Sequence, residues 1–269
     1  MAKVSLEQST YGSFTLLMRK LQEQLRGIVE LMQQSRRIVA LTGAGISTES
    51  GIPDFRSPGS IWQEIPPVSY HDFITKPEAR QQYWQTRNHL SLQVASAQPN
   101  EAHKALVELE RRGMLLGVIT QNFDGLHQDA GHLPEHIVEL HGTSRFAACT
   151  LCGARSSISQ LQQRINAGEL DPTCIDCGGF LKAATILFGQ RIPQTELVRA
   201  KDLAEACDLL LVVGSSLKVR PAASLPHLAL NRRIPFVIIN LEPTPLDDYA
   251  DIIIREKAGM ILPALVALL

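Results

Sequence analysis

Short apolar runs alternate with longer amphipathic stretches along most of the chain. Six of these runs are apolar at nearly every position, which is typical of strands buried on both faces of a parallel sheet. They span residues 38–41, 115–120, 137–140, 209–213, 236–239 and 252–254. The pattern therefore predicts six central strands.

Helical periodicity fills the stretches between these strands. Before the first strand, Leu17, Leu21, Leu25, Ile28 and Met32 recur at helical spacing and predict one amphipathic face. Helices are also predicted over residues 101–112, 195–206 and 222–232. Because strands and helices alternate, the sequence predicts an α/β fold with a Rossmann-like, doubly wound parallel sheet.

Two segments interrupt this alternation. Residues 52–98 and 143–185 each leave the carboxyl end of a predicted strand, and we expect them to form a smaller lobe together. The remaining residues, 1–51, 99–142 and 186–269, would form the lobe that holds the sheet. A cleft between the two lobes would then lie at the edge of the sheet where ligands bind.

Length and composition agree with one compact α/β unit that carries an insertion. The chain has 269 residues, of which 45% are hydrophobic, and a formal net charge of −1. This balance offers no basic excess for nucleic acid or an anionic membrane. No secretory signal is evident, and no apolar run reaches the roughly 18 residues that span a bilayer. We expect a cytoplasmic protein without nucleic-acid or membrane partners.

The run LTGAGISTESGIPDFR, residues 41–56, follows the first predicted strand. Gly43 and Gly45 would let the backbone approach a pyrophosphate closely, although an ordinary glycine turn fits the same pattern. The dinucleotide fingerprint of dehydrogenases has a third glycine, but Thr48 stands at that position and prolines follow where its second strand belongs. The loop therefore predicts a phosphate-bearing ligand and argues against a hydride-transferring dehydrogenase.

Four of the five cysteines form two CxxC pairs in the second insertion. Cys149 stands with Cys152, and Cys174 with Cys177, at a separation close to that of a zinc ribbon. Two disulfides or a redox pair are the alternatives. The absence of a secretory signal argues against the first, and the matched set of four argues against the second. Since four thiolates fill the coordination sphere of zinc, we predict one structural zinc ion.

Polar residues directly follow several of the predicted strands. They are Gln121, Asn122, Asp124, His141, Gly214, Ser215, Ser216 and Asn240. Taken singly, Asn122 and Asp124 fit a turn or helix cap, and His141 fits a structural histidine. Because the carboxyl ends of parallel strands meet at one edge of a sheet, the whole set predicts a crevice that holds a long ligand beside a titratable base.

The other histidines and the fifth cysteine give no such signal. His103 lies on a predicted helix, His127 follows a turn, and His132 and His136 have no evident partners. We interpret them as structural or surface residues. Cys207 is expected to be a small buried core residue.

Several long strings of the sequence resemble the sirtuin (Sir2) family. They are GAGISTESGIPDFRS at 43–57, TQNFDGLHQDAG at 120–131, HG at 141–142, GSSLKVRPA at 214–222 and INLEPTPLD at 239–247. The similarity extends over about residues 38–265. The string HDFITKPEARQQYW at 71–84 resembles the subgroup that includes mitochondrial lipoamidase-type sirtuins.

The resemblance implies an NAD-dependent protein-lysine deacylase that releases nicotinamide and forms O-acyl-ADP-ribose. Acidic-acyl removers carry a tyrosine and an arginine three residues apart, whereas Tyr83 and Arg87 are four apart. We therefore expect a neutral acyl group, which could be long. Two other classes stay open: a mono-ADP-ribosyltransferase or NAD glycohydrolase, and a non-catalytic protein that senses NAD.

The resemblance also implies roles for particular residues. His141 would be the general base on the ribose hydroxyls, and Asn122 and Asp124 would lie beside the nicotinamide ribose, with Gln121 on its hydroxyls. The other NAD-binding positions that the motifs imply are Gly43, Ala44, Gly45, Ser47, Thr48, Glu49, Ile52, Asp54, Phe55, Arg56, Gly214, Ser215, Ser216, Asn240, Glu242, Lys257 and Ala258.

An acyl-lysine peptide would add as an extended strand between two segments, 186–189 and 218–220. The implied substrate contacts are Ile186, Phe188, Gly189 and Val219. The family usually has a proline near Ala183 and a glutamate at the position of Gln190. Loss of that acid would weaken the attraction to basic peptides.

Overall fold

The central element of the fold is a six-stranded parallel sheet. The structure, a computed structural model, describes the backbone of residues 2–54 and 66–269, and within these the side chains of residues 18–54, 66–87, 94 and 96–269. The strands are β1 (Ile38–Thr42), β2 (Leu115–Thr120), β3 (Ile137–Glu139), β7 (Leu209–Val213), β8 (Phe236–Ile239) and β9 (Ile252–Ile254). Their order is β3-β2-β1-β7-β8-β9, so the direction of winding reverses between β1 and β7. The predicted Rossmann-like, doubly wound sheet is confirmed.

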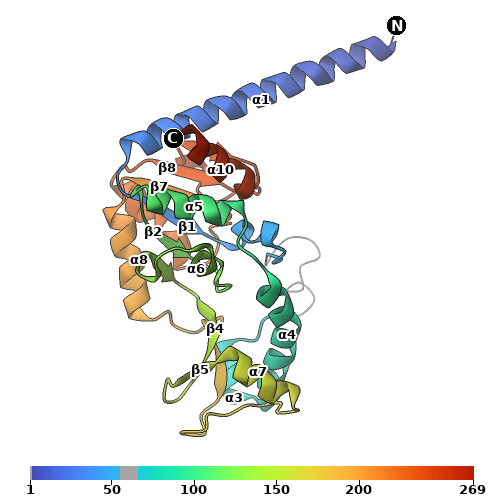
Figure 1. Cartoon of the computed structure of the whole chain (residues 1–269), viewed down its shortest axis with the longest axis vertical. Coiled ribbons are helices and arrows are strands. Elements are labelled where there is room, and N and C mark those ends of the chain that lie inside the picture. The colour runs from blue at the N-terminus through green and yellow to red at the C-terminus, as the bar shows by residue number, and fades with distance from the viewer. Residues whose placement is uncertain (1, 55–65) are drawn as a thin grey trace.

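Both faces of the sheet are buried because most positions of its strands are apolar. Ile38 and Ala40 of β1 point into one hydrophobic core, and Val39 and Leu41 point into the other. Helices α1 (Ala2–Gln34), α5 (Glu101–Arg111) and α10 (Ala258–Leu268) cover the first face, while α8 (Gln194–Ala206) and α9 (Pro226–Asn231) cover the second (Figure 1). The alternation of side chains along each strand thus produces the two layers of helices.

Two helical predictions need correction or extension. The helix expected over residues 222–232 is divided into a one-turn 3-10 helix, η4 (Ala222–Ser224), and α9, which begins at Pro226. Proline favours the first turn of a helix and cannot continue a preceding one, because it lacks the amide proton. Helix α10 is an additional element, and Pro263 within it obscured its periodicity.

The long helix α1 begins away from the rest of the molecule, and its C-terminal part packs against α10 and β9 (Figure 1). Ile28 and Met32 are fully buried there, and Gln24 donates a hydrogen bond to the carbonyl oxygen of Ile253 at 2.6 Å. This contact is the buried part of the amphipathic face that the sequence predicts.

A three-stranded antiparallel sheet forms the smaller part of the molecule, at the bottom of Figure 1. It consists of β4 (Gly142–Cys149), β5 (Arg155–Ser157) and β6 (Leu181–Thr185), in the order β5-β4-β6. Helices α3 (Tyr70–Thr75), α4 (Pro77–Ser96) and α7 (Ile158–Asn166) lie beside it. The predicted domain boundaries themselves stay a prediction.

The two inserted segments contact each other through a buried arginine. Arg80 Nε of α4 donates to both carboxylate oxygens of Asp171, and Nη2 donates to Oδ2. The guanidinium lies 3.6 Å from the centre of the Phe180 ring. Phe73, Trp84 and Leu161 join the same apolar cluster. A bidentate ion pair of this kind fixes geometry as well as supplying attraction.

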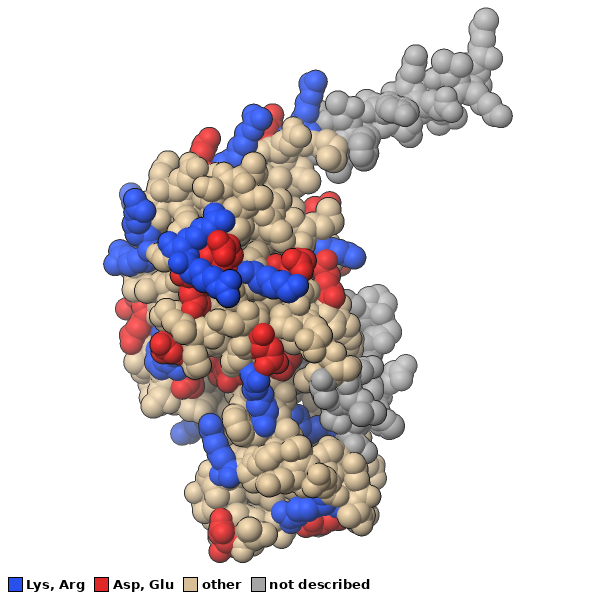
Figure 2. Space-filling model, in the orientation of Figure 1, with Lys and Arg blue, Asp and Glu red and all other residues tan. Residues whose placement is uncertain are grey.

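The remaining elements are short. They are α6 (Leu126–Ala130) and the 3-10 helices η1 (Ala44–Ile46), η2 (Thr48–Ser50), η3 (Pro134–His136) and η5 (Asp247–Tyr249). Within the described ranges, no helix combines the length and the apolar character needed to cross a membrane. On the face drawn in Figure 2, acidic and basic side chains are interspersed, in keeping with the small net charge.

Three of the histidines that we expected to be structural or surface residues form a buried row. The ring of His127 lies 4.9 Å from that of His103 and 5.5 Å from that of His132, measured between centroids. His127 Nε2 lies 3.0 Å from Thr42 Oγ1 of β1. The expectation that His132 and His136 lack partners is wrong, because both contact the carboxylate of Glu110.

These histidines predict a loss of stability in acid. Burial lowers the pKa of His103 to about 4, and the neighbouring His132 adds to this effect. The unfolded chain, with an ordinary pKa near ~6.5, binds the proton first, so the stabilisation is complete above that pH and is lost as the pH falls towards 4. We expect His103 to account for a loss of about 2 kcal/mol in the free energy of unfolding between pH 7 and pH 5.

Urea denaturation at the two pH values checks this prediction. In His103→Phe, which keeps a ring but cannot titrate, the loss between pH 7 and pH 5 should shrink by about the same amount. Titration of the cysteines affects both proteins equally and cancels in the difference. An equal pH dependence of the two proteins would contradict the assignment.

Candidate active site and metal centre

The site is built at the point where the winding of the sheet reverses, because the loops after β1 and β7 meet there. The amide of Gly43 donates to the carbonyl oxygen of Val213 at 3.1 Å, and that of Gly45 donates to Gly214 at 2.8 Å. A Cβ atom at Gly43 would lie 2.8 Å from the Gly214 oxygen, and one at Gly214 would lie 2.2 Å from the Ile46 nitrogen. Glycine is therefore required on both sides of this contact, in addition to any need for close approach to a phosphate.

Side chains that follow β2 hold the loop that follows β1. Asn122 Nδ2 donates to the carbonyl oxygen of Gly43 and to Ser47 Oγ, each at 3.1 Å. Ser47 Oγ in turn donates to Asp124 Oδ2 at 2.8 Å. The three side chains therefore form one network at the carboxyl ends of neighbouring strands.

Asp124 also fits the alternative interpretation as a turn residue. Its Oδ1 accepts a hydrogen bond from the amide of Leu126, two residues on, at 3.0 Å, while the N-cap residue of α6 is Gly125. Burial raises the pKa of Asp124, and the hydrogen bonds from Leu126 and Ser47 act in the opposite direction. The turn and a place in the polar network are compatible because the carboxylate has two oxygens.

A second polar pair connects β2 with the loop after β7. Gln121 Nε2 donates to Ser215 Oγ at 2.7 Å, and the same hydroxyl oxygen accepts from the amide of Leu217 at 3.3 Å. Leu217 has a φ of 51°, in the left-handed region that is costly for a residue with a side chain. Ser215 therefore helps to hold a strained turn directly beside the predicted cofactor site.

The ring of His141 is oriented by the backbone. Its Nδ1 lies 2.8 Å from the carbonyl oxygen of Gln121, which can only accept, so Nδ1 carries the proton and Nε2 of the neutral ring can accept one. Burial lowers the pKa of His141 below its ordinary value, although the hydrogen bond to Gln121 opposes this effect. The imidazole is thus neutral at neutral pH, as a general base must be.

A large cavity of about 1860 Å³ joins these groups. Most of the predicted cofactor residues line it, namely Gly43, Ala44, Gly45, Ser47, Ile52, Asp54, Gln121, Asn122, Asp124, His141, Gly214, Ser215, Ser216, Asn240 and Glu242. The predicted substrate residues Ile186, Phe188, Gly189 and Val219 line it as well. The structure therefore brings together residues from distant parts of the sequence, while their individual roles stay predictions.

Two of the predicted cofactor residues, Phe55 and Arg56, lie outside the described residues. Four of the others, Thr48, Glu49, Lys257 and Ala258, do not line the cavity. The hydroxyl group of Thr48 donates to the carbonyl oxygen of Gly45 at 3.0 Å, so it supports the loop.

Glu49, Lys257 and Ala258 meet at the start of α10. Glu49 accepts a hydrogen bond from the amide of Gly259 at 2.8 Å, while Lys257 and Ala258 are the N-cap and first residue of that helix. A carboxylate at a helix N-terminus is favourable because it accepts from an otherwise unsatisfied amide. Glu49 thus connects the loop after β1 to α10.

Sequence reasoning missed several side chains that line the cavity. Tyr83 and Arg87 of α4 are among them. The hydroxyl oxygen of Tyr83 accepts a hydrogen bond from the amide of Ala183 at 3.2 Å. Arg145 also lines the cavity and pairs with Asp129 at 2.6 Å. These contacts depend on the packing of the two sheets and leave no signal in sequence spacing.

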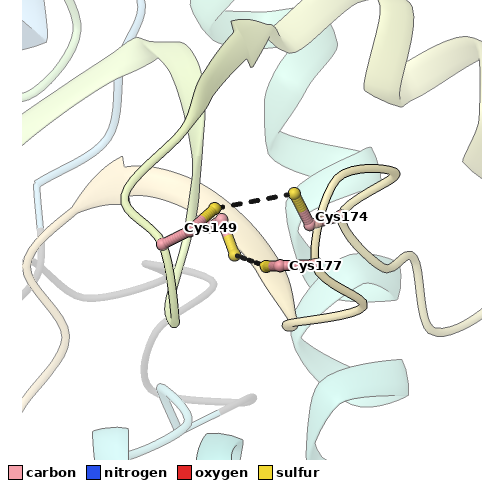
Figure 3. A group of neighbouring side chains, drawn as sticks. Cys149, Cys174 and Cys177 are labelled. Carbon is pink, nitrogen blue, oxygen red and sulfur yellow. Dashed lines mark hydrogen bonds between the residues drawn. The ribbon is translucent and has the colours of Figure 1, made fainter.

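The four predicted cysteines converge at the end of the small sheet. Their sulfur atoms all lie within 4.8 Å of one another and point toward a common centre (Figure 3). Cys149 Sγ is 3.5 Å from Cys177 Sγ, and Cys152 Sγ is 3.8 Å from Cys174 Sγ. A tetrahedral zinc ion with bonds of about 2.3 Å requires sulfur atoms separated by about 3.8 Å, so the cluster fits a structural zinc ion.

The surroundings of the cluster also fit a metal. A Cβ atom at residue 179 would lie 2.8 Å from Cys149 Sγ, so Gly179 leaves the space that the sulfur atoms need. The amide of Leu151 donates to Cys149 Sγ at 3.4 Å, which favours the thiolate. Cys207, by contrast, is fully buried in the core of the central sheet, on the face that α8 and α9 cover, as predicted.

The doubly wound sheet, the cavity at its switch point and the four-cysteine cluster define a Rossmann-like protein with a zinc-ribbon insertion. The family model of the Sir2 family matches residues 43–221. This match begins at the glycine loop after β1 and ends at Pro221. The chain therefore belongs to the Sir2 family, as its resemblance to sirtuins predicts.

Relatives and solved structures agree with this assignment. The chain is 46% identical over 232 residues to the NAD-dependent protein deacetylase 2 of Streptomyces coelicolor, with 85% of this chain and 95% of the relative covered. It is 43% identical over 240 residues to the NAD-dependent protein deacetylase of Thermodesulfovibrio yellowstonii, with 89% and 93% covered. The solved Sir2–p53 peptide–NAD+ structure matches with a TM-score of 0.83 and 34% identity, and covers 91% of this chain and 98% of that one.

Removal of the metal tests the zinc assignment. Elemental analysis should find one equivalent of zinc per chain, and Cys149→Ser or Cys177→Ser should lose the metal and unfold the small sheet. We expect these variants to lose thermal stability, because metal-binding free energy is also folding free energy. Cys207→Ser is the matched control and should retain the zinc. A soluble, fully active protein without metal would contradict a structural zinc ion.

Proposed function

We propose that the chain is an NAD-dependent protein-lysine deacylase that transfers the acyl group to ADP-ribose and releases nicotinamide. The observation that carries this proposal is His141, whose Nδ1 is occupied by Gln121 while the ring lines the cavity. Two relatives of the chain, at 46% and 43% identity, are NAD-dependent protein deacetylases. A solved Sir2 structure at 32% identity is described as containing a deacetylated p53 peptide and 3'-O-acetyl ADP ribose.

Within this proposal, the two loops at the switch point hold the diphosphate. Gly43 and Gly45 leave room for close approach, and because their own amides donate to Val213 and Gly214, the amide of Ala44 is the one in this run that would meet the diphosphate. Ser215 and Ser216 of the loop after β7 would hold the adenosine side, together with Asn240 and Glu242. NAD would supply the ADP-ribosyl group that receives the acyl group.

The remaining residues act around the nicotinamide end. Ile52 and Asp54 would line the nicotinamide pocket, and the network of Ser47, Asn122 and Asp124 would fix the loop beside it. His141 Nε2 would then accept a proton from a substrate hydroxyl group. The acyl-lysine segment would lie between residues 186–189 and 218–220 as an extended strand.

Product analysis separates this function from its alternatives. Incubation with NAD and an acetyl-lysine peptide should give free lysine peptide and O-acetyl-ADP-ribose, both seen by mass spectrometry. Labelled ADP-ribose found only on protein would instead identify an ADP-ribosyltransferase. NAD binding without any release of nicotinamide would identify a binding protein.

The acyl group is a second element of the proposal, and we propose a neutral one. One observation favours an acidic acyl group instead. Arg87 lines the cavity and has no carboxylate partner among the described residues. A panel of acetyl, lipoyl and succinyl peptides distinguishes the two. Turnover of succinyl-lysine much faster than of acetyl- or lipoyl-lysine would contradict the neutral acyl group.

The role of His141 predicts both a mutational and a pH effect. His141→Ala should reduce kcat by about 10²- to 10⁴-fold, as loss of a general base does. The base must be unprotonated, so kcat/KM in the wild-type protein should fall as the pH drops through a pKa below ~6.5.

The matched control for this experiment is His227→Ala, an exposed histidine that does not line the cavity. It should retain the wild-type rate and pH profile. If His141→Ala keeps the wild-type rate of O-acetyl-ADP-ribose formation, the assignment of the base is wrong.

A further inference from the structure

The charged groups that line the cavity are not evenly distributed. The acidic ones are Asp54, Asp124, Asp129 and Glu242. They lie after β1, after β2, in α6 and after β8. On or within two residues of the segments that would hold the acyl-lysine peptide, 186–189 and 218–220, the charged lining residues are all cations, namely Arg191, Lys218 and Arg220. The walls proposed for the peptide therefore carry positive charge only.

These three cations are not neutralised by the protein. Their side chains are exposed, and within the described part of the chain none of them has an ion pair or a hydrogen bond. Arg145, another arginine that lines the cavity, differs in this respect because it pairs with Asp129. The positive charge of Arg191, Lys218 and Arg220 is thus available to a ligand.

The turn beside these residues adds no opposing charge. The amide of Gln190 donates to the carbonyl oxygen of Leu187 at 2.9 Å, and the Gln190 side-chain oxygen accepts from the Leu187 amide at 3.1 Å. Gly189, at the corner, has a φ of 82°, and Phe188 is 55% exposed. The side chain of Gln190 is therefore occupied within the turn and carries no charge that could offset Arg191.

We propose that Arg191, Lys218 and Arg220 select protein segments in which acidic residues flank the acylated lysine. This inference rests on the proposed function, because it takes these segments as the peptide-binding walls. Acylation removes the charge of the target lysine, so the flanking residues alone determine the charge of the segment. Aspartate or glutamate there would gain partners on both walls, whereas lysine or arginine would be repelled.

A pair of peptides tests the proposal directly. Both have the same length and a central acetyl-lysine, and they differ only in carrying aspartates or lysines at the flanking positions. We expect kcat/KM to favour the acidic peptide by about tenfold at low salt, since each exposed pair contributes modestly. The preference should shrink to about twofold in 0.5 M NaCl because salt screens exposed charges.

Charge-reversal variants assign the effect to these residues. A variant that combines Arg191→Glu, Lys218→Glu and Arg220→Glu should invert the preference and favour the basic peptide. A variant with Arg191→Lys, Lys218→Arg and Arg220→Lys should keep the wild-type order. The matched control is Lys20→Glu, which makes the same kind of charge change on the exposed side of α1. The ratio between two peptides does not depend on the fraction of active protein, so partial misfolding cannot imitate an inversion.

The outcomes also separate this inference from the proposed function. Equal kcat/KM for the two peptides in the wild-type protein, or a ratio unchanged by the triple charge reversal, would overturn the selection of acidic segments and leave the deacylase intact. Absence of turnover with both peptides, in the presence of NAD, would overturn the deacylase and the inference together.

Discussion

The contact between the loop after β1 and the loop after β7 is the constraint on which the rest of the site depends. Gly43, Gly45 and Gly214 bring the two backbones together so closely that a single Cβ atom would clash with main-chain atoms. The reversal of winding in the sheet opens a crevice at this point, and the glycines determine its floor. A diphosphate bound here would meet two loops whose backbones are already held in place by hydrogen bonds between them.

Polar side chains hold the two loops in place around this contact. Asn122 and Ser47 tie the first loop to the end of β2, and Gln121 and Ser215 tie the second loop to the same strand end. The backbone of Gln121 also orients His141, so one short segment after β2 holds both loops and the imidazole ring. Burial of these groups explains the direction in which the pKa values of Asp124 and His141 move. Hydrogen-bonded networks of this kind keep a buried polar site in one arrangement.

The sequence predicted the central sheet well because its strands are buried on both faces and read as continuous apolar runs. The four-cysteine cluster was also predictable from the sequence, because two CxxC pairs at this spacing are typical of a zinc site, and the structure brings their sulfur atoms together. Elements that depend on tertiary packing were harder to predict. The stretch of residues 222–232 splits at Pro226, α10 carries an internal proline, and the pairing of Arg80 with Asp171 joins two insertions far apart in the sequence.

The same distinction between local pattern and tertiary packing applies to the candidate site. Residues that directly follow a strand could be placed at one sheet edge by topology alone, and they do line one cavity. The partners of Glu49 and Tyr83 could not be foreseen, because Glu49 accepts from the start of α10 and Tyr83 accepts from the amide of Ala183. Hydrogen bonds across the fold have no counterpart in local sequence pattern.

The stoichiometry of a single-turnover reaction tests the central claim most directly. Acetyl-lysine peptide, NAD and excess protein would be quenched together, and nicotinamide, deacetylated peptide and O-acetyl-ADP-ribose would be quantified in the same sample. The account predicts equal amounts of all three products. Nicotinamide formed without deacetylated peptide, or peptide deacetylated without O-acetyl-ADP-ribose, would contradict it.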